Sequence, residues 1–208
     1  MYRVVLAFLL GFIITSASAR ELCTYRTYSW NTIEKKSVNH ELVTKSYADL
    51  SESEVDPLTG CSVCEQDQRT INLAPLKSFK VCHVFAGQIE DIVTGLIRSG
   101  EPVYSVTGYR VGKTRGTVDH NGNRTQFSNH SYGIAIDINP EQNGLYDNCL
   151  EFNDSCRLIR GGSWSPENRG SLSADGVVVN AFKDLGLKWG GQIQGWQKDF
   201  MHFSPSGY

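Results

Sequence analysis

The sequence predicts an α+β fold, and three observations carry this prediction. Residues 83–98 place apolar side chains at helical spacing, which indicates an amphipathic helix. Residues 134–138 instead alternate isoleucine with small or acidic residues, which is the period-two pattern of a strand. Helical and extended segments follow one another without a regular alternation of the two, and such mixing is typical of the α+β class.

The composition limits the class of the protein. Its 208 residues fit one domain of ordinary size, and an apolar fraction of 40% is enough to build a core. A formal net charge of -2 gives no electrostatic footprint for nucleic acid, and no basic run suits an anionic membrane. We therefore expect no nucleic-acid partner, and we expect a monomer.

The chain begins with a predicted secretory signal peptide, residues 1–19. Arg3 supplies a positive charge, residues 4–15 form an apolar stretch, and residues 17–19 (Ala-Ser-Ala) match the small-residue cleavage pattern. A retained anchor is the less favoured alternative, because spanning a bilayer takes roughly 20 apolar residues. We expect a periplasmic or secreted protein that begins at Arg20 and has no stable membrane anchor.

The mature chain is expected to have two parts. Residues 20–69 form an N-terminal, disulfide-linked elaboration, in which polar, irregular sequence with scattered aromatic residues suggests a short strand or hairpin. Residues 70–208 form the main domain. Its first helix, at 83–98, is expected to end at Gly100 and Pro102, which stop helices.

The rest of the main domain reads as short strands, loops and one more helix. A strand is expected at 102–107, a loop rich in glycine and polar residues at 111–127, and a long polar loop at 139–172. The second helix is predicted to have Ser173 as its N-cap and to end at Gly186. Its predicted inward face consists of Val178, Ala181, Phe182 and Leu185. A strand and tight turn are expected at 187–191, and a last strand near residue 202.

Six cysteines in an exported chain predict disulfides. Cys149 and Cys156 flank a short polar loop and are expected to close it. The pairing of Cys23, Cys61, Cys64 and Cys82 stays open. Cys61 and Cys64 also have the spacing of a redox or zinc motif, but they follow a turn-rich loop rather than a strand, so a structural role is favoured.

The first half of a candidate metal site lies around His130 and Asp137. Seven positions separate the two residues, so an unbroken strand would place them on opposite faces. A shared metal therefore requires a bend, which Gly133 permits. On this hypothesis His130 lies on the loop and Asp137 on the strand. Gly133 and Ala135 share the strand face of Asp137 and leave room there for an ion and substrate, while the isoleucines point into the core.

The second half lies near the end of the chain, where Asp199 and His202 are three positions apart. A turn that ends at His202 would let the imidazole bind the metal while Asp199 reaches a water molecule beside it. Three protein ligands, an open position and a nearby base are the inventory of a catalytic zinc centre. The chain's other histidines, at positions 40, 83 and 120, are expected to be ordinary core or surface residues.

These motifs resemble those of the M15 peptidases, the zinc D-alanyl-D-alanine carboxypeptidases, D,D-dipeptidases and L-alanyl-D-glutamate endopeptidases of bacterial cell walls. The resemblance is carried by Ser-x-His-x2-Gly-x-Ala-x-Asp and the downstream Asp-x2-His-Phe, and it covers about residues 70–208. It implies a Hedgehog-like or D,D-peptidase-like fold, in which a small antiparallel sheet has flanking helices. It also implies Zn²⁺ as cofactor.

The resemblance assigns a role to each matching residue. The metal ligands would be His130, Asp137 and His202, and the catalytic base would be Asp199. An arginine after a Gly-Tyr pair at a strand end binds substrate or the oxyanion, which implies this role for Arg110; Ser128 would hydrogen-bond substrate or a ligand.

The substrate implied by the family is the stem peptide of peptidoglycan. Aspartate rather than glutamate at the base position, together with residues 189–191 (Trp-Gly-Gly), leans towards the endopeptidase branch rather than the carboxypeptidases. The competing hypothesis is a non-catalytic zinc module that binds cell-wall peptide or a protein, because a fold does not determine a function. Such a module would not need the base and Arg110, so hydrolysis is favoured.

Overall fold

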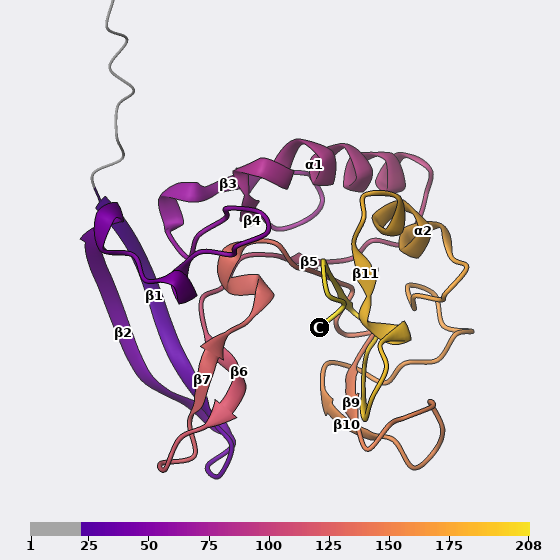
Figure 1. Cartoon of the computed structure of the whole chain (residues 1–208). Helices are drawn as coiled ribbons and strands as arrows, with labels where there is room; N and C mark the ends of the chain where they lie inside the picture. Colours follow the sequence, from indigo (N-terminus) through magenta and orange to yellow (C-terminus); the bar gives the residue numbers. More distant parts are fainter. Residues whose placement is uncertain (1–21) are drawn as a thin grey trace, which may run out of the picture.

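A computed structural model describes residues 22–208, which fold into four small sheets and two α-helices (Figure 1). The α+β class is thereby confirmed, whereas the closer likeness to the Hedgehog domain remains a prediction. The predicted signal peptide and the cleavage site lie outside the described residues. Within residues 22–208, no helix has the length and apolarity needed to cross a membrane.

The N-terminal sheet has the strand order β2-β1-β6-β7. Its strands are β1 (Leu22–Asn31), β2 (Lys36–Ser46), β6 (Lys113–Val118) and β7 (Arg124–Phe127). The expected hairpin in the elaboration is confirmed and is long, whereas the loop expected at 111–127 is wrong. No residue of β6 or β7 is buried, so their sequences lack the apolar alternation that marks a half-buried strand. They are held in the sheet by pairing, β6 with β1 and β7 with β6.

Three disulfides join the described residues, and no cysteine among them is free. The expected bridge between Cys149 and Cys156 is confirmed. Cys23 pairs with Cys64 within residues 20–69, and Cys61 pairs with Cys82, which joins this segment to residues 70–208. Since Cys61 and Cys64 have different partners, the redox or zinc reading of this pair is wrong.

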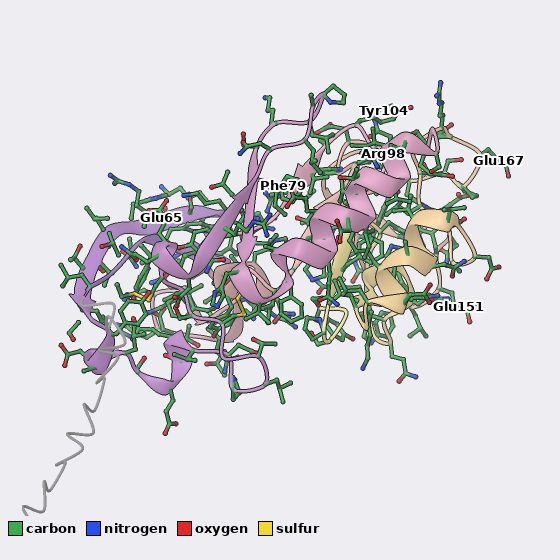
Figure 2. The ribbon with its side chains drawn as sticks, turned by 90° about the horizontal axis from the view of Figure 1, so that it is seen from above. Glu65, Phe79, Arg98, Tyr104, Glu151 and Glu167 are labelled. Atoms are coloured by element: carbon green, nitrogen blue, oxygen red, sulfur yellow. A yellow bond between two sulfur atoms is a disulfide. The ribbon has the colours of Figure 1, made fainter. Side chains whose placement is uncertain are left out.

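The helix α1 (His83–Arg98) is confirmed with the predicted bounds. It follows a two-stranded sheet of β3 (Gln68–Ile71) and β4 (Phe79–Cys82). Seen from above, α1 runs from the strand that carries Phe79 to Arg98, with α2 beside it (Figure 2). The helix ends as expected, because Gly100 adopts a positive φ of 82° that favours glycine.

The central sheet has the order β11-β13-β8-β5 and carries the candidate site. Its strands are β5 (Val106–Thr107), β8 (Ile136–Ile138), β11 (Lys188–Trp189) and β13 (His202–Ser204). The last strand begins at His202 as expected. The strands expected at 102–107 and 134–138 are shorter than predicted, because only their final residues pair with neighbours. The isoleucines at 134, 136 and 138 are buried, as the alternation predicts.

The second helix, α2 (Val177–Asp184), packs on the central sheet. Phe182 is fully buried, and its ring lies 4.7 Å from the ring of Phe203 between their centroids. Burial of a side chain of this size contributes roughly 1.5–3 kcal/mol. The predicted terminator Gly186 is confirmed by its positive φ of 91°. Ser173 as N-cap is wrong: the cap is Gly176, because a turn closed by the Ser173 carbonyl delays the helix by three residues.

Two strands of a third sheet lie in the segment that was expected to be a loop at 139–172, so this expectation is also wrong in part. Its order is β10-β9-β12, with β9 (Leu145–Asp147), β10 (Arg157–Arg160) and β12 (Gln197–Asp199). Short 3-10 turns complete the chain: η1 (Tyr47–Asp49), η2 (Glu52–Glu54), η3 (Glu65–Asp67), η4 (Asn129–Tyr132) and η5 (Gly190–Gln192). Figure 1 shows β6 and β7 on one side of the C-terminal end and β9 and β10 on the other.

Candidate metal centre

Three buried side chains meet at one end of the central sheet: His130 from η4, Asp137 from β8 and His202 from β13. Asp137 Oδ1 lies 3.0 Å from His130 Nε2 and 3.0 Å from His202 Nδ1. The two imidazole nitrogens are themselves 3.2 Å apart. The three donor atoms therefore form a nearly equilateral triangle.

The fold brings this triangle together in two ways. In the antiparallel pair of β8 and β13, Asp137 lies directly opposite His202, so both side chains leave the sheet on the same face. His130 reaches them because the chain bends at Gly133, whose φ of 69° favours glycine. A side chain at Gly133 would also collide with the Gln68 side chain and the Cys82 backbone. The bend that the spacing requires is therefore present.

The triangle fits a tetrahedral zinc ion. Ligands at 2.0–2.1 Å from zinc in tetrahedral geometry are roughly 3.3 Å from each other, close to the observed 3.0–3.2 Å. Two imidazoles and a carboxylate are ligands that zinc accepts in catalytic sites. No second group of three such side chains lies close together in the described part of the chain. His40 instead stacks on Tyr28, and His83 contacts the Asp67 carbonyl.

A backbone carbonyl orients the first histidine. Nδ1 of His130 lies 2.7 Å from the carbonyl oxygen of Gly108 and donates its hydrogen there, which leaves Nε2 as the lone-pair nitrogen that faces the triangle. Gly108 has no side chain for a steric reason, since a Cβ there would collide with the Lys80 carbonyl of β4. Gly108 belongs to the motif that contains Arg110, but the sequence carries no signal for this contact.

The electrostatics of the triangle suit a metal. Burial raises the pKa of Asp137, but the charges and hydrogen bonds of His130 and His202 outweigh it and hold the pKa well below its ordinary value. Burial lowers the pKa of His130 and keeps this imidazole neutral, which is the form that binds metals. For His202 the carboxylate of Asp137 outweighs burial and raises the pKa.

Asp199 lies at the end of β12, and the turn at residues 200–201 separates it from His202. Burial raises the pKa of Asp199 to about 6, and the negative charge of Asp137 adds to this rise. Its Oδ1 is buried and has no hydrogen-bond partner among the described residues. Gly190 allows the strand to approach, because a side chain there would collide with the Asp199 carbonyl. Asp199 therefore combines a raised pKa with a carboxylate oxygen that has no partner among the described residues.

The remaining predicted residues lie beside the triangle. A guanidinium nitrogen of Arg110 lies 3.3 Å from Asp137 Oδ2, the oxygen that does not face the imidazoles, while its Nε has no partner among residues 22–208. Ser128 precedes η4 and is buried; its Oγ lies 3.4 Å from the Ser131 hydroxyl. The roles of Arg110 and Ser128 towards a substrate stay predictions.

Comparison with known proteins identifies the segment that carries this centre. Residues 121–205 match the model of a family described as D-alanyl-D-alanine carboxypeptidase. The match includes the triangle and Asp199, while Arg110 precedes it. Comparison of the chain with curated proteins and with solved structures gave no significant match. The resemblance to the M15 peptidases that the sequence motifs carry is thereby confirmed over residues 121–205.

Proposed function

We propose that the protein is an exported zinc metallopeptidase that hydrolyses the stem peptides of peptidoglycan. The observation that carries this proposal is the buried His130–Asp137–His202 triangle with Asp199 beside it, within the segment that matches a peptidase family. Three disulfides support an exported protein, because such bonds persist in oxidising compartments. The family description supports a peptidoglycan peptide as the substrate.

His130, Asp137 and His202 would hold the metal, which in such sites acts as a Lewis acid and makes water a nucleophile near neutral pH. Asp199 accepts the proton of the attacking water and returns it to the leaving amine. Its raised pKa of about 6 suits both transfers, since a general base works best when its pKa is close to the working pH.

Arg110 stabilises the developing oxyanion or holds a substrate carboxylate. Its planar fork of donors suits either task, and the position of its guanidinium beside Asp137 Oδ2 supports a place at the reacting carbonyl. The hydrogen bond from Arg110 also holds the Asp137 carboxylate, which keeps Oδ1 turned towards the two imidazoles.

For the bond that is cut, we propose the L-alanyl-D-glutamate bond within the stem. Aspartate at the base position supports this choice, as does the glycine pair that follows Trp189, where Gly190 packs on Asp199. The alternative is release of D-alanine, the reaction in the family's description. Mass spectrometry of purified muropeptides after digestion decides between them: D-alanine as sole product, with tripeptide-containing muropeptides uncut, would replace the endopeptidase with a carboxypeptidase.

A second candidate is a zinc-containing module that binds cell-wall peptide without cutting it. A binding module has no need for a carboxylate with a raised pKa and a free oxygen beside the metal ligands, so Asp199 favours hydrolysis. If zinc-loaded protein binds muropeptides and leaves them all intact, the binding module takes the place of the peptidase.

A further inference from the structure

The sheet β10-β9-β12 has one face that points to the core and one that carries Asp199. Tyr146 lies opposite Leu158 on one side and Lys198 on the other, and its ring packs into the core against Phe200. Residues opposite each other in a sheet share a face, and neighbours along a strand alternate. Leu145 and Asp199 therefore lie on the other face, and a register shift in β10 between Leu158 and Arg160 places Arg160 opposite Leu145, on this face as well.

This register places an arginine on the same face as the proposed base. Two strand spacings separate the backbones of Arg160 and Asp199, which is roughly 10 Å at about 4.8 Å per spacing. Leu145 lies between them and is partly exposed. The two charges interact, since the positive charge of Arg160 lowers the pKa of Asp199 against the larger effect of burial. The strand register and the effect of Arg160 on the pKa of Asp199 both indicate that these two side chains lie on the same face of the sheet.

The Arg160 side chain is exposed and forms no hydrogen bond or ion pair within the described part of the chain. Its neighbour on the same face, Arg157, differs in this respect: its Nε lies 2.8 Å from Asp147 Oδ1, and a second guanidinium nitrogen contacts the other oxygen. The guanidinium of Arg157 is therefore already occupied by a carboxylate, whereas that of Arg160 is available to a ligand.

The backbone at Arg160 is held in place although its side chain is free. Gly161 and Gly162 follow it and pack so closely on Pro140 and Glu141 that side chains would collide with their carbonyls. The Gly162 amide donates a hydrogen bond of 2.9 Å to the Pro140 carbonyl. A ligand would therefore meet a side chain that extends from a fixed strand end, which reduces the entropy lost on binding.

We propose that Arg160 binds a carboxylate of the peptide substrate, with Leu145 as the apolar surface between this carboxylate and the scissile bond. The inference rests on the proposed peptidase function and adds a specificity-determining residue to it. A span of roughly 10 Å corresponds to about three extended residues, so the carboxylate belongs to a residue within that distance of the cleaved bond. Its source is a side-group or a C-terminal carboxylate, since both offer two oxygens to the guanidinium fork.

The test uses zinc-loaded protein and three synthetic stem peptides: one unmodified, one with the D-glutamate α-carboxyl amidated and one with the C-terminal carboxyl amidated. For the native protein, we expect amidation of the recognised carboxylate to lower kcat/KM about tenfold to a hundredfold. Arg160→Gln should lower kcat/KM for the unmodified peptide by a similar factor and abolish the difference in kcat/KM between the unmodified and the amidated peptide. Arg160→Lys should restore part of this difference. The amidated peptide with the lower kcat/KM identifies which carboxylate Arg160 binds.

Arg157→Gln is the matched control, because it removes an arginine from the same strand and face that is already paired. Arg157→Gln should keep the difference in kcat/KM between the unmodified and the amidated peptide. The inference would be overturned if Arg160→Gln preferred the unmodified peptide over the amidated one as strongly as the native protein does. It would also be overturned if Arg160→Gln and Arg157→Gln lost this preference equally.

A binding measurement separates this inference from the proposed function. Calorimetry on zinc-loaded Asp199→Asn protein reports affinity for the three peptides without hydrolysis. A loss of affinity on amidation that depends on Arg160 would sustain the inference, and if the native zinc-loaded protein also left all three peptides uncut, the inference would stand while the peptidase is rejected. Equal binding of all three peptides, or no binding, would reject the inference.

Discussion

Nε2 of His130 lies 3.2 Å from Nδ1 of His202, although 72 positions separate the two residues in the chain. Two imidazole nitrogens that face each other at this distance, with a carboxylate oxygen 3.0 Å from each, form a set of ligand atoms that suits a metal cation. The pairing of β8 with β13 and the bend at Gly133 create it. The catalytic proposal depends on this contact.

The first prediction concerns the metal. We expect one zinc ion per mature chain, and we expect its loss in His130→Ala or His202→Ala, because two ligands rarely retain zinc against dilution. Metal analysis after gel filtration measures the content. His120→Ala, which changes an exposed histidine, should bind zinc like the native protein. Full zinc retention in either ligand variant would reject the ligand assignment.

The second prediction concerns the base. Asp199→Asn should keep the metal but lose most activity, on the order of a hundredfold or more in kcat, because an amide cannot accept the proton of water. The measurement pairs turnover of muropeptides with the zinc content of the same sample. Undiminished turnover in zinc-loaded variant would remove Asp199 from this role, and loss of zinc would instead indicate that Asp199 is a ligand.

The third prediction concerns the stability of metal-free protein. The pKa of Asp199 is about 6 in the folded state, above the ordinary value of 3.8 in an unfolded chain, mainly because of burial. The folded state therefore binds more protons, and the contribution of this group to the free energy of unfolding falls as pH rises from about 4 to 6. The total loss is on the order of 3 kcal/mol and persists at neutral pH.

Asp199→Asn removes the loss in the free energy of unfolding that ionisation of Asp199 causes, because an amide does not ionise. Relative to the native protein, the metal-free variant should gain stability between pH 4 and pH 7, which denaturant unfolding in the presence of a chelator would measure. A difference in the free energy of unfolding that does not change over this range would contradict the raised pKa. Together with the second prediction, this result would mean that the base is kept at a cost in stability.

The fourth prediction concerns Glu54 in the N-terminal elaboration. Burial raises its pKa, but hydrogen bonds from Tyr25, Lys45 and Ser51 outweigh this and lower the pKa to about 2. The folded pKa lies below the ordinary 4.5, so the stabilisation, on the order of 3 kcal/mol, is present above pH 4.5 and is lost as pH falls towards 2.

Glu54→Gln should therefore destabilise the protein at pH 7, and the difference from the native protein should shrink at pH 3. Unfolding in urea at both pH values tests this. Glu52→Gln changes an exposed neighbour on the same turn and should have little effect at either pH. An equal destabilisation by Glu54→Gln at pH 7 and pH 3 would show that the stabilisation does not depend on its charge.

Local patterns in the sequence were enough to predict the parts that depend on short stretches of chain. The helix at 83–98 follows from its apolar stripe, and the Cys149–Cys156 bridge follows from a short loop. The spacing of His130 and Asp137 required a bend at Gly133, which is present. By contrast, β6, β7 and β10 were missed because none of their residues is buried, and strands of this kind carry no apolar alternation.

By itself, the sequence determined which side chains are available for a metal centre and the local conformations that present them, because spacing within a strand or turn sets which face a residue occupies. Only the tertiary structure decided that His202 lies opposite Asp137, that the Gly108 carbonyl orients His130, and that Arg160 shares a face with Asp199. These relationships depend on the register between strands distant in sequence. Register is set by the packing of whole faces against the core, which no short stretch of sequence contains.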